Sequence, residues 1–477
     1  MSTFSGLGTA LSSLIAQRQA LEVSGQNIAN ANTVGYTRQR AALSSLPAAT
    51  VASMFSTSSG VGQGTAVTGF ERLGDVFLDT RLRTQTSGAA YLSQVSTAYT
   101  TLESTIGEPS DTGLSTDLTN FWTAWSDVAN SPDSDSARAV LLERATSVAD
   151  RISTLYQDTG TQWSQALTQT QALVTEVNTT AANVADLNQR ILSITNAGGS
   201  ANELMDQRDQ LVTQLSELAG ATMRTNENGT VDVMVAGNAL VSGSKVNELA
   251  VSSSSPTTFA DAVDGGTVSV VWAKSGNPAS PDGGSIAGLL TVLAPSSSGG
   301  ILTGAADSLN SLATSIATQV NAIHSTGYTV AGYTTGTTAG DFFSLTAGQP
   351  AALGLTVAVS SVDDIAVAGS GQGELDGSIG EQIAALADAT GGPSAQWSAF
   401  VVDLGVHSAS AQSRADVAEQ ARATAEAAQL AVTSVDTDEE TVNMLAYQRG
   451  YEGAARVLTA IDEMLDTLIN RTGVVGL

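Results

Sequence analysis

The chain has 477 residues, carries 46 acidic side chains against 19 lysines and arginines for a formal net charge of −27, and contains no cysteine. This acidity argues against nucleic acid and anionic membranes as partners, because binding to phosphate groups requires clustered cations. The missing cysteine excludes disulfides, thiolate nucleophiles and the common zinc sites, and no apolar stretch approaches the roughly 20 residues of a transmembrane helix.

The first predicted element is a helix at the N-terminus. No lysine or arginine precedes Arg18 and serines interrupt the apolar stretch, so we expect no cleavable signal peptide. Apolar side chains recur every three or four residues and form a narrow stripe, which suits packing against another helix better than against a broad core. We call this stripe the N-terminal seam; it comprises Phe4, Leu7, Leu11, Leu14, Leu21 and Ile28.

A helical body follows between about residues 84 and 220. One apolar stripe runs from Leu141 to Leu155, and a longer one from Trp163 to Ile194 predicts a helix on the order of 50 Å long. A helix of that length indicates an elongated domain. The segment 196–200 breaks the pattern, which resumes before Gly220.

The pattern changes to strands after Gly220. Alternating valines from Val231 to Val235, followed by Gly237-Asn238, predict a hairpin. Further strands are expected at 267–272 and 353–359, with an amphipathic helix from Leu309 to Ile323 between them.

The last forty residues again predict a helix with a narrow apolar stripe, about 37 Å long. Thr437 and Glu440 fit the capping box that begins a helix. Neither terminal helix can bury itself alone, so each needs a partner: the other terminal helix, a neighbouring subunit, or the surface of a globular core. The C-terminal seam comprises Met444, Tyr447, Tyr451, Ala454, Leu458, Ile461, Leu465 and Leu468.

These elements predict a mainly α fold with a β-rich insertion and a nested topology. We expect a terminal coiled coil from 1–45 and 430–477. An elongated, mainly helical domain is expected from 46–224, 286–325 and 376–429. A strand-rich outer domain is expected from 225–285 and 326–375.

Candidates for chemistry are weak, and we predict no catalytic, cofactor or metal site. His324 and His407 lack the paired spacing of metal ligands, and no glycine-rich segment has a phosphate-binding pattern. The acidic run 436–440 suits a helix N-terminus better than a calcium loop. Trp122 and Trp125 are expected to pack together in a core.

Both ends of the chain carry a distinctive sequence motif. The segment 23–39 resembles the N-terminal signature of the bacterial flagellar axial proteins of rod, hook and hook-associated type, and 438–471 resembles their C-terminal helix. Val34 stands where that family has proline, so the fixed φ is missing, although Gly35 can still take a positive φ. The matching motif residues are Asn27, Asn30, Asn32, Gly35 and Tyr36.

Two further segments, 75–83 and 320–327, together with the helical region that follows the N-terminal signature, resemble the FlgK family of the hook–filament junction. The resemblance implies a non-enzymatic, extracellular subunit that assembles with copies of itself through its terminal helices. It implies as partners the hook protein, a further hook-associated protein on the filament side, the flagellar type III export apparatus and an export chaperone. We expect the ends to be poorly ordered in the monomer and helical after assembly.

Two other interpretations stay open. The chain could be a hook or distal-rod subunit, although those proteins enter strands soon after the N-terminal signature. It could also be an axial protein whose insertion acts as an adhesin or hydrolase, but no zincin motif or convergent pair of acids is visible there.

Overall fold

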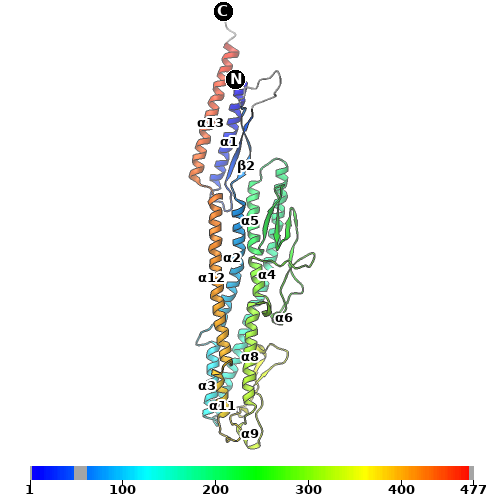
Figure 1. Ribbon diagram of the computed structural model, residues 1–477, viewed down its shortest axis with the longest axis vertical. Coiled ribbons are helices and arrows are strands. Elements are labelled where there is room, and N and C mark those ends of the chain that lie inside the picture. The colour runs from blue at the N-terminus through cyan, green and yellow to red at the C-terminus, as the bar shows by residue number, and fades with distance from the viewer. Residues whose placement is uncertain (1–2, 48–61, 472–477) are drawn as a thin grey trace, which may run out of the picture.

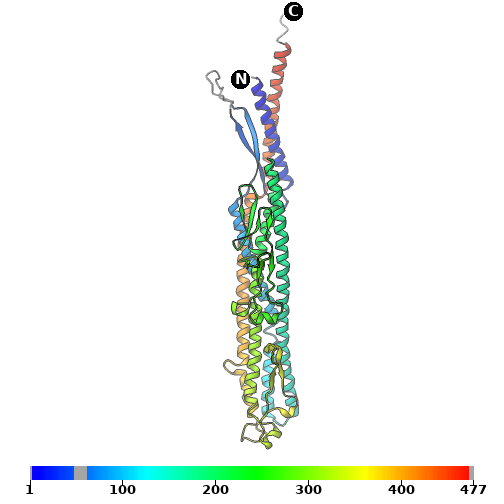
Figure 2. The same cartoon turned by 90° about the vertical axis from the view of Figure 1, so that its right-hand side faces the viewer.

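The computed structural model describes residues 3–47 and 62–471, and the molecule is a long rod (Figures 1 and 2). Both termini lie at the same end of this rod, and short strands flank its helical body. The expected mainly α fold with a β-containing insertion is confirmed. Within the described residues, no helix is both long and apolar enough to cross a bilayer.

The helical body is built around one very long helix, α4 (Asp135–Asn196), where two stripes were expected. Its 62 residues correspond to about 93 Å at 1.5 Å per residue. Gly160 lies within this helix, and its missing side chain leaves room for Phe259, whose ring would lie 2.9 Å from a Cβ at that position. The expected end at 196–200 is confirmed.

Other long helices complete the main core: α2 (Val76–Ile106), α3 (Leu114–Asn130), α8 (Ile301–His324) and α12 (Pro393–Thr433). The first three contact α4, whereas α12 packs mainly on α2. Phe121, Trp125 and Trp163 are fully buried there, and Trp122 is 3% exposed, so the tryptophans of α3 are packing residues as predicted.

A second core lies where a small antiparallel sheet packs on α4 and α5 (Asn202–Ala219). The sheet has the order β3-β4-β5-β6, and the predicted hairpin is present. Its two-residue turn is Ala236-Gly237, both at positive φ, one residue before the predicted Gly237-Asn238, because Asn238 pairs with Val235 as the first residue of the next strand. A separate β7–β8 pair packs nearby. The strands are β3 (Thr222–Thr225), β4 (Val231–Val235), β5 (Asn238–Ser242), β6 (Lys245–Val246), β7 (Leu249–Val251) and β8 (Val270–Trp272).

The two strand-rich segments do not form the single outer domain that the sequence suggested. Residues of β9 and β10 join the main core with α3 and α8, whereas β4 and β5 belong to the second core. The expected strand 353–359 is also shorter, because its first residues form a helical turn. The remaining elements are α6 (Phe259–Val263), α7 (Gly284–Val292), α9 (Val330–Thr335), β9 (Phe343–Leu345), α10 (Ala351–Gly354), β10 (Leu355–Val357) and α11 (Ser378–Ala384).

At the other end of the rod, α1 (Thr3–Ala29) and α13 (Thr437–Asp466) lie side by side (Figure 1). A hairpin of β1 (Gln39–Leu46) and β2 (Gly64–Arg72) packs against α1. This hairpin therefore extends the terminal part beyond the boundary expected at residue 45. On the C-terminal side, α12 ends at Thr433 and α13 begins at Thr437, close to the boundary expected at 430.

Candidate functional site

The candidate functional site is the terminal helix pair together with its attachment to the rod. The two helices run antiparallel. A Cβ at Gly6 would lie 3.2 Å from Ile461 Cδ1, and one at Gly450 would lie 2.9 Å from the side-chain amide of Gln17. Glycine at these positions therefore allows the two backbones to approach closely.

The N-terminal seam lies only partly in this contact. Leu7, Leu14, Leu21 and Ile28 are half-buried, Leu11 is 47% exposed, and the side chain of Phe4 lies outside the described residues. The fully buried face of α1 carries smaller residues that the apolar pattern did not single out. These buried residues are Ala10, Ala16, Ala20, Ser24 and Asn27. Their recurrence in steps of three, four and six is the sequence signal that could have identified this face.

The C-terminal seam is also mixed. Ala454 and Ile461 are buried, whereas Tyr451 is 37% and Leu468 54% exposed. The remaining members, Met444, Tyr447, Leu458 and Leu465, are half-buried. The seam residues thus face α1 in part, and the pair does not bury them completely.

A second set of apolar side chains on α13 lies away from α1, and we call it the outer strip. At 100° per residue Val442 and Leu445 fall on the side of α13 opposite the seam, whereas Val457 and Met464 lie beside it. Their exposed fractions range from 48% to 65%. The outer strip comprises Val442, Leu445, Val457 and Met464.

Asn27 of the family motif holds together the loop that follows α1. Its Oδ1 accepts hydrogen bonds from Gln39 N at 3.0 Å and Tyr36 Oη at 2.9 Å, and its Nδ2 donates to Gln39 O at 2.8 Å. Burial, together with nearby carboxylates, raises the pKa of Tyr36 to about 12, so the phenol stays protonated as a donor.

The other motif residues have different roles. Gly35 has φ +76°, as predicted, and a Cβ there would collide with the side chain of Gln210, whose Nε2 donates to Val34 O at 2.6 Å. The side chain of Val34 is 90% exposed. Asn30 bonds to Gln26 O at 3.0 Å within its own turn, while Asn32 is exposed. The motif therefore docks the terminal part on α5.

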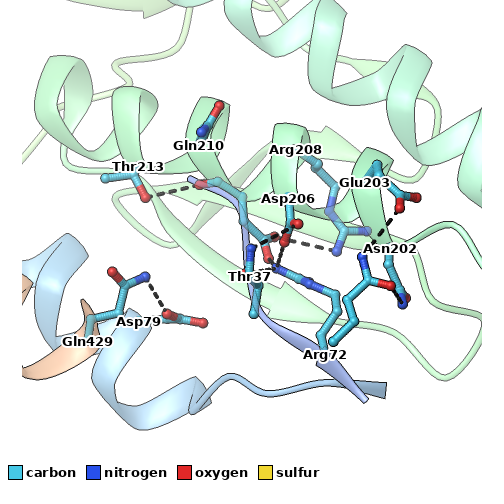
Figure 3. A network of polar contacts seen from close by, with 12 residues as sticks. Thr37, Arg72, Asp79, Asn202, Glu203, Asp206, Arg208, Gln210, Thr213 and Gln429 are labelled. Atoms are coloured by element: carbon cyan, nitrogen blue, oxygen red, sulfur yellow. Dashed lines mark hydrogen bonds and ion pairs between the residues drawn. The ribbon is translucent and has the colours of Figure 1, made fainter. Parts of the chain in front are cut away.

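A buried ionic cluster reinforces this docking (Figure 3). Arg72 at the end of β2 contacts Asp206 at 2.7 Å and Asp209 at 2.8 Å, both on α5, and Thr37 N donates to Asp206 Oδ2 at 3.1 Å. Burial raises the pKa of Asp206 despite the opposing effect of Arg72. The sequence did not reveal this cluster, because more than 130 residues separate its partners.

A second ionic contact joins the same loop to α13. Arg38 contacts Glu440 at 2.7 Å and Glu439 at 2.9 Å, and Glu440 is 2% exposed. The predicted capping box at Thr437 and Glu440 is therefore wrong. Asp436 caps α13 through the amides of Asp438 and Glu439, while Glu440 is taken by Arg38.

The residues considered for chemistry have structural environments. His324 is fully buried, with Nδ1 2.7 Å from Gly340 O and Nε2 accepting from Ala366 N, and burial lowers its pKa. His407 lies on the surface, stacked on Tyr99. Among the described residues, no three metal-ligating side chains gather in one place.

Family models match three parts of the chain. The flagellar hook-associated protein FlgK helical domain matches residues 99–343, the flagellar basal body rod FlgEFG protein C-terminal model matches 430–471, and the flagella basal body rod protein model matches 7–37. The first model alone covers about half of the chain, and the other two cover much of the terminal helices.

Two curated proteins and one solved structure that resemble the chain carry related names. The chain is 28% identical to flagellar hook-associated protein 1 of Bacillus subtilis, over all of this chain and 99% of that protein. It is 30% identical to flagellar hook-associated protein 1 of Escherichia coli, over 73% of this chain and 61% of that protein. A solved structure of the flagellar hook junction protein FlgK from Burkholderia pseudomallei is 28% identical, with a TM-score of 0.48, over 56% of this chain and 47% of that one. On the strength of the family models, the chain belongs to the FlgK family of flagellar hook-associated proteins.

Proposed function

We propose that this chain forms the junction zone between hook and filament of the bacterial flagellum, and that copies assemble through their terminal helices. Membership of the FlgK family makes the chain a structural subunit of the flagellum. The name of the curated relatives, flagellar hook-associated protein 1, supports a place next to the hook. The hook protein on one side and a further hook-associated protein on the other are the partners that this location requires.

One observation carries the assembly mechanism: the terminal pair has an apolar outer strip that the single chain leaves exposed. Monomeric soluble proteins rarely expose large contiguous apolar surfaces, and larger ones mark sites of interaction. Burying each of these side chains against a neighbouring subunit stabilises the assembly by about 1–2 kcal/mol. The motif and the ionic contacts attach the pair to the rod, so that it presents the strip in a defined direction.

We further propose that the chain reaches this extracellular place through the flagellar export apparatus, with a chaperone and without cleavage of a signal peptide. The absence of cysteine suits a chain that travels unfolded, because no crosslink can form on the way. An activity in the insertion remains the alternative function, and no cluster of metal-ligating groups in the described residues favours it.

The assembly mechanism is tested by Val442→Glu and Leu445→Glu, singly and together. We expect the double variant to be secreted and to keep the helical content of the parent, but to leave hooks without filaments. Leu375→Glu is the matched control, because Leu375 is 52% exposed but lies far along the rod. Normal filament growth with the double variant would contradict the proposal.

The location is tested separately by deleting the gene. Loss of a junction subunit should leave hooks on the cell and unpolymerised filament protein in the medium. Loss of a hook subunit should leave no hooks at all, which electron microscopy of the cell surface distinguishes.

A further inference from the structure

A small cavity of about 370 Å³ lies where α2, the end of α5 and the beginning of α7 meet. Arg83, Ser87 and Tyr91 of α2 line one side, and the backbone at Gly220 and Gly283 lines the other. The cavity belongs to the helical body and takes no part in the terminal pair.

Arg83 is the unusual residue of this cavity. Its side chain is only 5% exposed, yet no hydrogen bond or ion pair joins it to any other residue in the described part of the chain, and its Nε is buried without an acceptor. The other buried arginines have partners: Arg208 bonds to Gly229 O at 2.8 Å, and Arg138 bonds to Val362 O at 3.2 Å. A buried cation without an acceptor is strongly disfavoured unless an anion compensates it.

The N-terminus of α7 lies at the same cavity. Its N-cap residue, Gly283, provides no side-chain cap, so the first amides of this nine-residue helix keep their donors. Gly283 has no side chain for a steric reason as well, because a Cβ there would lie 2.2 Å from Ser87 Oγ. The helix dipole adds partial positive charge at this position.

Other groups around the cavity set its electrostatic balance. Asp282 lines it but is exposed and lies beyond ion-pair distance of Arg83, while Asp79, one turn before Arg83, accepts a hydrogen bond from Gln429 at 2.9 Å. The end of α5 faces the same space, where the amides of Gly220 and Ala221 bond to the carbonyls of Ser216 and Leu215 and the last three carbonyls of the helix add partial negative charge. The overall negative charge acts weakly here, because salt screens charges beyond about 8 Å.

We propose that this cavity binds a small oxyanion of the phosphate or sulfate type, held by the guanidinium of Arg83 and the hydroxyl of Ser87 beside the N-terminus of α7. Guanidinium groups bind such anions through two parallel hydrogen bonds, and the dipole of a helix N-terminus favours negative charge nearby. The bound anion would join α2, α5 and α7 at a point where side chains alone leave a buried charge uncompensated.

The test measures binding of inorganic phosphate to the purified full-length chain by calorimetry, with sodium chloride at equal ionic strength as the reference. We expect binding by the parent chain, a loss of affinity of about tenfold or more for Arg83→Gln, and unchanged binding for Arg81→Gln. Arg81 is the matched control, because it lies on the same helix but is exposed.

Asp282→Asn provides the second test, independent of whether Arg83→Gln folds. If Asp282 repels the bound anion, its neutralisation tightens phosphate binding. If Asp282 instead turns inward and pairs with Arg83 in solution, Asp282→Asn lowers the melting temperature, and phosphate does not bind to the parent chain. That result, or equal phosphate binding by the parent and Arg83→Gln, would overturn the proposal.

Discussion

Helices α4 and α13 have similar apolar periodicity but very different environments. In α4, 22 of 62 residues are buried, whereas in α13 only Glu440, Ala454 and Ile461 of 30 are buried. The long helix is surrounded by α3, α5, α8 and the small sheet, while α13 packs mainly on α1. The difference shows that a stripe of apolar residues predicts a helix, but its neighbours decide how much that stripe stabilises the single chain.

The largest expected effect separates these helices directly. Ile152 of α4 is fully buried, so Ile152→Ala should lower the free energy of unfolding by about 2–5 kcal/mol through lost burial and a cavity. Val457 of α13 is 51% exposed, so Val457→Ala should change it by less than about 0.5 kcal/mol. Urea unfolding of the purified chain measures both, and comparable effects would show that the terminal pair is a second core.

Hydrogen exchange sharpens the same comparison without a mutation. In the unassembled chain, amides in the middle of α4 should exchange at least about 100-fold more slowly than those of α1 and α13, because local opening of the pair exposes little buried surface. After assembly the terminal amides should become protected. Strong protection of both ends before assembly would show that the terminal pair is stable by itself.

The ionic cluster between these regions should have an intermediate effect. Arg72→Gln leaves Asp206 buried without its cation and should destabilise the chain by about 1–3 kcal/mol. The control is Arg40→Gln in the same hairpin, because its pair with Glu71, at 3.4 Å, is more than half exposed on both sides and should contribute almost nothing. If denaturant unfolding gave the same loss of stability for Arg72→Gln and Arg40→Gln, the cluster would not hold the terminal part on the rod.

The smallest effect concerns pH in the main core. Burial lowers the pKa of His324 below its usual 6.5, so the unfolded chain binds this proton more readily. The stability that neutral His324 contributes is therefore complete above pH 6.5. It is lost as the pH falls toward the pKa of the folded state, by at most about 1.4 kcal/mol per pH unit. The free energy of unfolding is measured at pH 7.5 and at lower pH. His324→Gln should remove its dependence on pH, whereas His407→Gln on the surface should not.

Local patterns predicted much of the fold correctly. The end of α5 at Gly220 and the hairpin of β4 and β5 follow from glycines that take positive φ, and such turns depend on few distant contacts. The terminal helices were predicted from the spacing of their apolar residues, which is also a local pattern. The continuity of α4 was not predicted, because the apolar stripe is interrupted between Leu155 and Trp163.

The assembly surface was predictable only in outline. The C-terminal seam includes the buried Ala454 and Ile461, but the most closely packed face of α1 carries Ala10, Ala16 and Ala20, whose small size lets the helices approach. Glu440 fitted a capping box by spacing alone, yet Asp436 caps the helix and Glu440 binds the distant Arg38.

The sequence by itself determined the family, the helical ends and the local turns of this protein, because motif spacing and backbone preferences act over a few residues. Only the tertiary structure decided which stripe is buried, that Arg72 forms an ion pair with Asp206, and that Arg83 is buried without a partner. Burial and ion pairing depend on which distant segments meet, and no short stretch of sequence contains that information.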